Sequence, residues 1–290
     1  MKRLLVGIDF GTTTDSVLDS AASLGKRLGC KVLLFHAIEY VPNGYETVPA
    51  DECDIAQHFD NRLAELCAAL KESGVKARAL PAKTGPSVEV TLKLAKAEKA
   101  DAILVGVSNR GALERFFLGS TAEKLVRRSK WPVFLRHPED PGGDFGTVLC
   151  AVDYSPHSEH SLRSAVGLAR MLKAELHVLH VSPDPFTYPG LPDITVYHVS
   201  TPEPTAKARE LMNEFLERVD TEGVVVTPCL RSGAASATII SVCKEKKPGL
   251  LVIGKHGRGG ILDLVIGGVA TDILRDVPCS VLVVGKRELK

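Results

Sequence analysis

The sequence predicts an α/β protein of two tandem domains, each a five-stranded parallel sheet with helices on both faces. Three observations lead to this fold class. The chain has 290 residues, a length that suits two domains. Four apolar blocks occur twice in the same order, 144–148 residues apart. Within each copy, short runs that are apolar on both faces alternate with helical stretches, as in βαβ units.

The duplicated blocks are apolar runs that we expect to form buried strands. The first run ends in an aspartate in both copies, and these residues, Asp9 and Asp153, lie 144 positions apart. The second run ends in a histidine and the third in a glycine in both copies. The paired blocks cover residues 4–9 and 148–153, 32–36 and 176–180, 102–106 and 250–254, and 131–135 and 277–282. Four matched blocks in one order indicate a tandem duplication.

Helices are expected in the segments between these runs, so that each copy has the order βαβαβαβαβ. The expected helices cover residues 16–28, 56–72, 87–98, 120–129, 158–172, 205–220, 235–246 and 269–275. A turn-rich segment at 137–144 separates the copies, which predicts domains at 1–138 and 146–290. The Pro-rich segment 182–204 is interpreted as an excursion loop inside the second domain.

Composition excludes several classes of protein. Lys and Arg number 36 against 35 Asp and Glu, so no basic excess favours nucleic acid or an anionic membrane. No stretch approaches the roughly 20 apolar residues of a membrane helix. The seven cysteines form no C-x-x-C pair, which is typical of reduced buried thiols in a cytoplasmic protein. We expect no metal site.

Two features of each copy should lie at the carboxyl edge of its sheet, where ligands bind in open parallel sheets. One is the aspartate after the first strand, Asp9 or Asp153. The other is a glycine-rich loop after the fourth strand. In such a loop the backbone N–H groups can approach phosphate oxygens, and the following helix adds its positive end. A nearby carboxylate can accept ribose hydroxyls, so the pair is typical of a nucleotide site.

Structural interpretations of the same residues stay open. The glycines can be tight turns, and either aspartate can cap a loop or the helix that follows. Ser120 with Glu123 matches the S-x-x-E capping box, so Ser120 can be a helix cap instead of a ligand contact.

With these motifs in place, the chain resembles a tandem universal stress protein over nearly all 290 residues. The resemblance implies Rossmann-like, or flavodoxin-like, domains. The family pattern is an aspartate after the first strand and G-x2-G-x9-G-[ST] after the fourth, which contacts ATP in its nucleotide-binding members. The second copy has Gly254, Gly257 and Gly267 at this spacing, but Gly268 replaces the Ser or Thr.

The first copy departs from the pattern at another position. It has Gly106, Gly119 and Ser120, followed by Thr121, but Asn109 replaces the second glycine. The Asn side chain projects where a glycine would let phosphate approach. In the second copy Gly268 keeps its N–H and lacks only a hydroxyl, a loss of roughly 0.5–1.5 kcal/mol. We therefore expect the second copy to hold the better nucleotide site.

The resemblance further implies that the backbone at the end of the second strand, near Ala37 and Val181, meets adenine. Arg258 and Lys255 are candidate phosphate partners, and the expected ligand is ATP, with or without Mg²⁺. The last strands, at 133–135 and 281–284, would expose apolar edges, so we expect them to pair within the chain.

Three functions remain open from the sequence. The chain can be an adenine-nucleotide-binding regulatory module of the stress response that acts through an unidentified protein partner. It can be a scaffold or chaperone-like stress protein with degenerate pockets. An enzyme is the weakest alternative, at most a slow ATP hydrolase, because no Walker motif or nucleophile–base pair is present. Assembly into a homodimer is left undecided.

Overall fold

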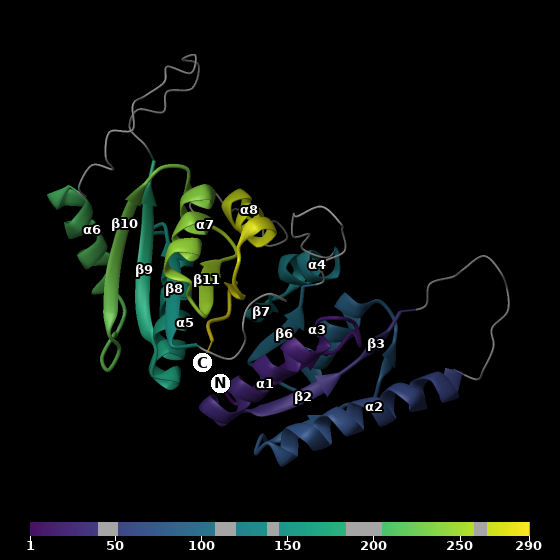
Figure 1. Ribbon diagram of the computed structural model, residues 1–290. Helices are drawn as coiled ribbons and strands as arrows, with labels where there is room; N and C mark the ends of the chain where they lie inside the picture. Colours follow the sequence, from purple (N-terminus) through teal and green to yellow (C-terminus); the bar gives the residue numbers. More distant parts are fainter. Residues whose placement is uncertain (40–51, 108–119, 138–144, 184–204, 258–265, 290) are drawn as a thin grey trace.

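The computed structural model describes residues 1–39, 52–107, 120–137, 145–183, 205–257 and 266–289, without the side chains of residues 52, 53 and 120. Its ten-stranded sheet has the order β10-β9-β8-β11-β12-β7-β6-β1-β2-β4. Each half is parallel, as the sequence predicts, and the halves join edge to edge (Figure 1). The predicted seam at 138–144 lies outside the described residues, so the boundaries 1–138 and 146–290 stay a prediction.

The first domain follows the predicted order of strands and helices. Its elements are β1 (Arg3–Gly7), α1 (Thr14–Leu28), β2 (Lys31–Phe35), α2 (Glu52–Glu72), β4 (Ala77–Ala79), α3 (Ser87–Ala97), β6 (Ala102–Gly106), α4 (Ser120–Arg128) and β7 (Val133–Arg136). Two short strands that the sequence did not predict, β3 (Ala37–Ile38) and β5 (Lys83–Thr84), form a separate ladder.

The second domain repeats this order without the extra ladder among its described residues. Its elements are β8 (Thr147–Val152), α5 (Pro156–Leu172), β9 (Glu175–Ser182), α6 (Ala206–Leu216), β10 (Val226–Ser232), α7 (Ala235–Lys246), β11 (Leu250–Gly254), α8 (Gly268–Asp276) and β12 (Val281–Val284). Helix α5 starts two residues before the predicted position because Ser155 caps it and Pro156 occupies its first turn. Helix α6 ends at Leu216 instead of residue 220.

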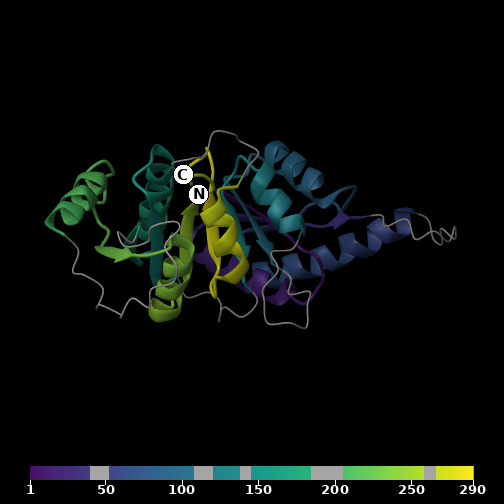
Figure 2. The same cartoon turned by 90° about the horizontal axis from the view of Figure 1, so that it is seen from above.

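Helices cover both faces of the sheet, and each face has its own hydrophobic core. Helices α1, α2, α5 and α6 pack on one face, where Leu24 and Leu162 are fully buried. Helices α3, α4, α7 and α8 pack on the other, around residues such as Leu125 and Ile273. The view from above shows helices of both domains along the molecule and the two chain ends close together near its middle (Figure 2).

The two domains meet through their last strands, and this confirms the predicted intramolecular pairing. Strands β7 and β12 are antiparallel, with Phe134 opposite Leu282 and Val133 opposite Val283. Phe134 lies opposite Leu104 of β6 in the strand register, and Leu282 lies opposite Val252 of β11. Leu104 and Val252 belong to the matched third blocks of the two copies, so Phe134 and Leu282 are equivalent residues. The equivalent residues are 148 positions apart, so the sequence match of Pro132 with Pro278 is two residues out of register.

Candidate nucleotide site

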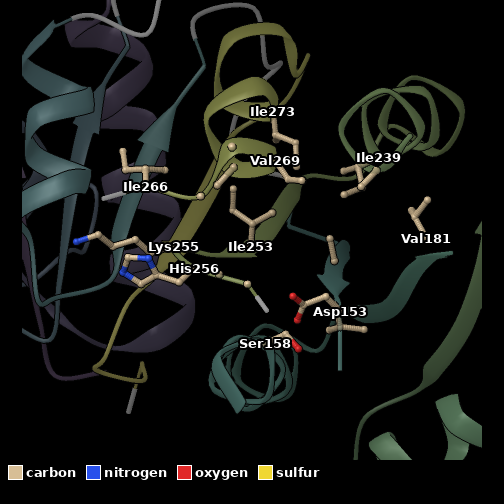
Figure 3. Close-up of a pocket in the computed structure, with 18 of the residues that line it drawn as sticks. Asp153, Ser158, Val181, Ile239, Ile253, Lys255, His256, Ile266, Val269 and Ile273 are labelled. Atoms are coloured by element: carbon tan, nitrogen blue, oxygen red, sulfur yellow. The ribbon is translucent and has the colours of Figure 1, made fainter. Parts of the chain in front are cut away.

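A cavity of about 590 Å³ opens at the carboxyl edge of the second domain's sheet. It lies beyond β8 and β11, and the first residues of α7 and α8 complete its wall (Figure 3). Cavities of this size hold small-molecule ligands in other proteins. Seven of the residues predicted for this domain's site line the cavity: Asp153, Val181, Gly254, Lys255, Gly257, Gly267 and Gly268.

Asp153 lies directly after β8 and its carboxylate is held in place by the following turn. Its Oδ1 accepts hydrogen bonds from the Ser155 backbone N–H at 3.0 Å and the Ser155 hydroxyl at 2.6 Å. The same Ser155 hydroxyl caps α5 by accepting the Ser158 N–H. Asp153 is thus a turn residue, as its capping interpretation suggested, and also a charged group on the cavity wall. Sequence analysis missed Ser155, although a Ser before a Pro-initiated helix is a known capping signal.

A histidine ties the end of the second strand to the turn that carries this aspartate. In the second domain the His180 Nδ1 lies 2.9 Å from the Val152 carbonyl, and the ring stacks on Tyr154 with centroids 3.9 Å apart. Tyr154 has a φ of 63°, a left-handed conformation that non-glycine residues seldom adopt. The His180 contacts therefore stabilise the strained turn next to Asp153.

The first domain repeats this arrangement with a different aromatic residue. The His36 Nδ1 lies 2.7 Å from the Ile8 carbonyl, and its ring contacts Phe10, whose φ is 56°. The histidines that end the second apolar run thus have the same structural role in both copies.

Two glycines of the loop have neighbours that exclude a larger residue. A Cβ on Gly257 would lie 2.5 Å from Oδ2 of Asp153, so the loop backbone packs directly against the carboxylate. A Cβ on Gly254 would lie 2.9 Å from the His256 carbonyl oxygen and 3.1 Å from the Ser161 hydroxyl. Gly254 needs to be glycine because backbone lies so close, and a side chain at Gly257 would have to displace the Asp153 carboxylate.

Gly268 differs, because its surroundings leave room for a side chain. No atom lies within 4 Å of the position of a Cβ on Gly268, whereas a Cβ on Gly267 would lie 3.6 Å from the Lys255 carbonyl oxygen. Gly268 is the first residue of α8 and is exposed. The departure from the family pattern at this position therefore has no steric cause in the described residues.

Two helices begin at the cavity without a side-chain cap. Gly267 and Ala234 precede α8 and α7, and neither N-terminus has a side-chain cap among the described residues. In α8 the first backbone bond within the helix runs from the Thr271 N–H to the Gly267 carbonyl. The preceding N–H groups, which include those of Gly268 and Val269, have no acceptor within the helix. Such N–H groups favour an anion.

Much of the remaining wall of the cavity is apolar, although Ser158 and His256 also line it. Val181 at the end of β9 lies on this side, together with Ile239 of α7 and Ile253 of β11 (Figure 3). Ile273 of α8 adds to it. Sequence analysis placed Val181 near a base but missed the three isoleucines, because their approach depends on how α7 and α8 pack against the sheet.

Lys255 does not direct its charge into this cavity. Its ammonium donates a hydrogen bond to the Arg127 carbonyl near the end of α4 in the other domain, and the residue is 5% exposed. Figure 3 shows the side chain pointing away from Asp153. The structure gives the Lys255 ammonium a backbone carbonyl as its partner, and the role of Lys255 as a phosphate partner stays a prediction. Arg258, the other candidate, lies outside the described residues.

In the first domain, part of the predicted site can be described. The exposed Asp9 accepts hydrogen bonds from the Gly11 N–H at 2.8 Å and the Thr14 hydroxyl at 3.3 Å, so it supports the start of α1. Gly106 ends β6 against the buried Thr13, which a Cβ on the glycine would overlap. Ala37 lies in the short strand β3.

The loop residues of the first domain are less completely described. Asn109 and Gly119 lie outside the described residues. Ser120 begins α4 and Thr121 follows it on an exposed position. The capping-box partner Glu123 forms an ion pair with Arg127 at 2.7 Å.

The described residues contain no group of three or more His, Cys, Asp or Glu side chains arranged to hold a metal ion. The Nδ1 atom of His160 lies 2.6 Å from the Glu288 carboxylate. Six of the cysteines are buried free thiols. No helix in the described part of the chain has the length and apolar character needed to cross a membrane.

Comparison with known proteins agrees with this architecture. The model of the universal stress protein family matches residues 1–136 and again 144–285. A universal stress protein of Mycolicibacterium smegmatis is 28% identical over 98% of this chain and 97% of its own. One from Mycobacterium tuberculosis is 32% identical over 64% of this chain, and the match spans 62% of that protein's length.

Solved structures share the fold over the whole chain. A universal stress protein from Archaeoglobus fulgidus has a TM-score of 0.74 at 22% identity and covers 98% of both chains. A putative one from Pseudomonas aeruginosa has a TM-score of 0.71 at 19% identity, over 98% of this chain and 93% of that one. The duplicated sequence, the two Rossmann-like halves and the double family match agree, and the chain belongs to the universal stress protein family as a tandem member.

Proposed function

We propose that the chain is a cytoplasmic regulatory module whose second domain binds an adenine nucleotide, with ATP as the expected ligand. One observation carries the proposal: Asp153, the loop glycines and the N-terminus of α8 all line one cavity of about 590 Å³. They supply the three kinds of contact that a nucleotide needs, namely an apolar wall, a carboxylate and N–H groups that have no acceptor within their own helix.

The chemistry of the wall suggests an orientation for the ligand. Adenine would lie against Val181 and Ile239, where apolar side chains exclude water. The ribose hydroxyls would donate to Asp153, and the phosphates would accept from the N–H groups at Gly257 and Gly268. Among the described lining residues Asp153 is the only carboxylate, so any Mg²⁺ would be held mainly by the phosphates.

The second domain is favoured over the first on steric grounds. The domain-two loop can pack on Asp153 because Gly257 has no side chain. In the second domain, a Cβ at position 257 would lie 2.5 Å from the Asp153 carboxylate. The matching residue of the first domain is Asn109, which has such a Cβ. In addition Asp9 is exposed, whereas Asp153 is half-buried and therefore less screened by water.

The proposal can be tested with a matched pair of variants, Asp153→Asn and Asp9→Asn. Each keeps an acceptor oxygen for the local turn and removes the charge. Nucleotide released from freshly purified protein is identified by chromatography, and Mg-ATP, cyclic AMP and GTP are titrated by calorimetry. Weaker ATP binding in Asp153→Asn alone supports the proposal. Equal loss in Asp9→Asn would move the site to the first domain, and absence of binding in the wild type would favour the scaffold function.

A further inference from the structure

A second, basic pocket of about 400 Å³ shares β9 and α7 with the nucleotide cavity but is lined by other residues of these elements. Several of its lining residues belong to β10. This strand is the terminal strand of the sheet (Figure 1). Arg209 of α6, Arg231 of β10 and Lys246 of α7 bring three cations to its wall, together with His177 of β9. Among its described lining residues there is no Asp or Glu.

Acidic residues near this pocket lie outside its lining. Glu245 is 3.6 Å from Arg231, and Glu175 is 3.9 Å from His177. Both glutamate side chains are more than half exposed, at 57% and 65%, so solvent screens them.

The equivalent region of the first domain contains an ion pair. Arg78 of β4 and Glu98 at the end of α3 form an ion pair there. In the strand register, Arg78 lies opposite Leu33 of β2. Thr227 of β10 lies opposite His177 of β9, which is the equivalent position of the second domain, so Thr227 replaces the arginine. A lysine in the left-handed conformation follows each helix: Lys99 with a φ of 50° after α3, and Lys247 with a φ of 46° after α7. The residues just before them, Glu98 and Lys246, are therefore equivalent, so Lys246 replaces the glutamate. At these two positions the second domain thus lacks the ion pair of the first domain and has a lysine in place of the glutamate.

We propose that this basic pocket is a second binding site, and that it takes a small phosphate-bearing anion with at least two negative charges. Arginine and lysine donors bind phosphate oxygens through charge-assisted hydrogen bonds. Asn213 and Thr227 add uncharged donors to the wall. Pro228 in β10 has no N–H, which disfavours pairing of an extended peptide with this edge and favours a small molecule.

His177 provides a probe of this site. Burial, followed by the charge of Lys246, lowers its pKa, while Glu175 acts in the opposite direction. A bound anion beside Arg231 and Lys246 would raise this pKa, because it stabilises the protonated ring. Binding should therefore shift the His177 ring resonance.

The test is calorimetry with inorganic pyrophosphate, alongside NMR of the histidine ring protons. Lys246→Glu is expected to weaken binding at least about tenfold, because repulsion replaces a charge-assisted hydrogen bond. Thr227→Arg combined with Lys246→Glu rebuilds the ion pair of the first domain, so it should fold normally and lose the site. Lys96→Gln is the control, since Lys96 is an exposed lysine in the last turn of the equivalent helix α3.

The outcomes separate this site from the nucleotide cavity. Binding that shifts His177 and is lost in Lys246→Glu, but survives Asp153→Asn, supports the proposal. Binding that is unchanged in Lys246→Glu, or that leaves the His177 resonance unmoved, overturns it. Absence of binding at millimolar pyrophosphate overturns it as well, whatever the result with ATP.

Discussion

Restoring the missing hydroxyl at Gly268 is expected to tighten nucleotide binding. The first residue of α8 has no atom within 4 Å of its prospective Cβ, and its φ is not in the left-handed region. A serine therefore fits without moving the backbone. Its hydroxyl would lie beside the uncapped N–H groups of α8, where the phosphates of the ligand are expected.

The expected magnitude follows from one added hydrogen bond. A net contribution of about 0.5–1.5 kcal/mol corresponds to an affinity about two- to tenfold higher. The matched control is Gly268→Ala, which adds the same Cβ and removes the same backbone freedom without the hydroxyl. Any change shared by both variants comes from the backbone, and the difference between them measures the hydroxyl contact.

The assay is calorimetric titration of nucleotide-free protein with Mg-ATP, together with thermal unfolding of the unliganded variants. Gly268→Ser should bind more tightly than both Gly268→Ala and the wild type, while the two variants should have similar melting temperatures. Equal affinities of the Ser and Ala variants would show that no ligand oxygen reaches this position. That result would refute the placement of the phosphates at the N-terminus of α8.

Three other predictions test the loop, the junction and the core. Gly257→Ala should weaken ATP binding at least about tenfold, because its Cβ would lie 2.5 Å from the Asp153 carboxylate; unchanged affinity in the same titration would show that the loop adapts freely. Phe134→Ala should lower the free energy of unfolding by about 3–5 kcal/mol, measured by denaturant titration, because Phe134 is 3% exposed opposite Leu282; a loss below about 1 kcal/mol would contradict the role of this junction. Burial raises the pKa of Cys30 from 9.0 to about 11, so its stabilising contribution is full below pH 9 and is lost as pH rises through about 11. The free energy of unfolding of the wild type should therefore fall by about 3 kcal/mol more than that of Cys30→Ala over this pH range. Parallel pH profiles of the two proteins would contradict the raised pKa of Cys30.

Side-chain direction explains which site residues could be predicted. Asp153 and Gly257 follow strands whose apolar patterns mark their ends, so their position at one edge of the sheet follows from the parallel topology. Lys255 also follows such a strand, but its ammonium crosses to Arg127 in the other domain. Only the packing of the two domains brings that acceptor to Lys255, so this contact could not be predicted from the sequence.

The register of the strands at the domain junction could not be predicted from the sequence either. The match of Pro132 with Pro278 suggested an equivalence of 146 positions, whereas Phe134 and Leu282 are equivalent in the folded strands. The structure sets the register because each strand must align with its parallel neighbour and also with its antiparallel partner.

By itself, the sequence determined the duplication, the order of strands and helices, and the placement of Asp9, Asp153, Gly106 and Gly254 at strand ends. These features depend on local periodicity and on a topology that parallel sheets impose. The tertiary structure decided the rest: which side chains enclose the cavity, why Gly257 excludes a Cβ, and where the cations around Lys246 gather. Those properties depend on distances between residues far apart in the chain, which are fixed only when the helices pack on the sheet.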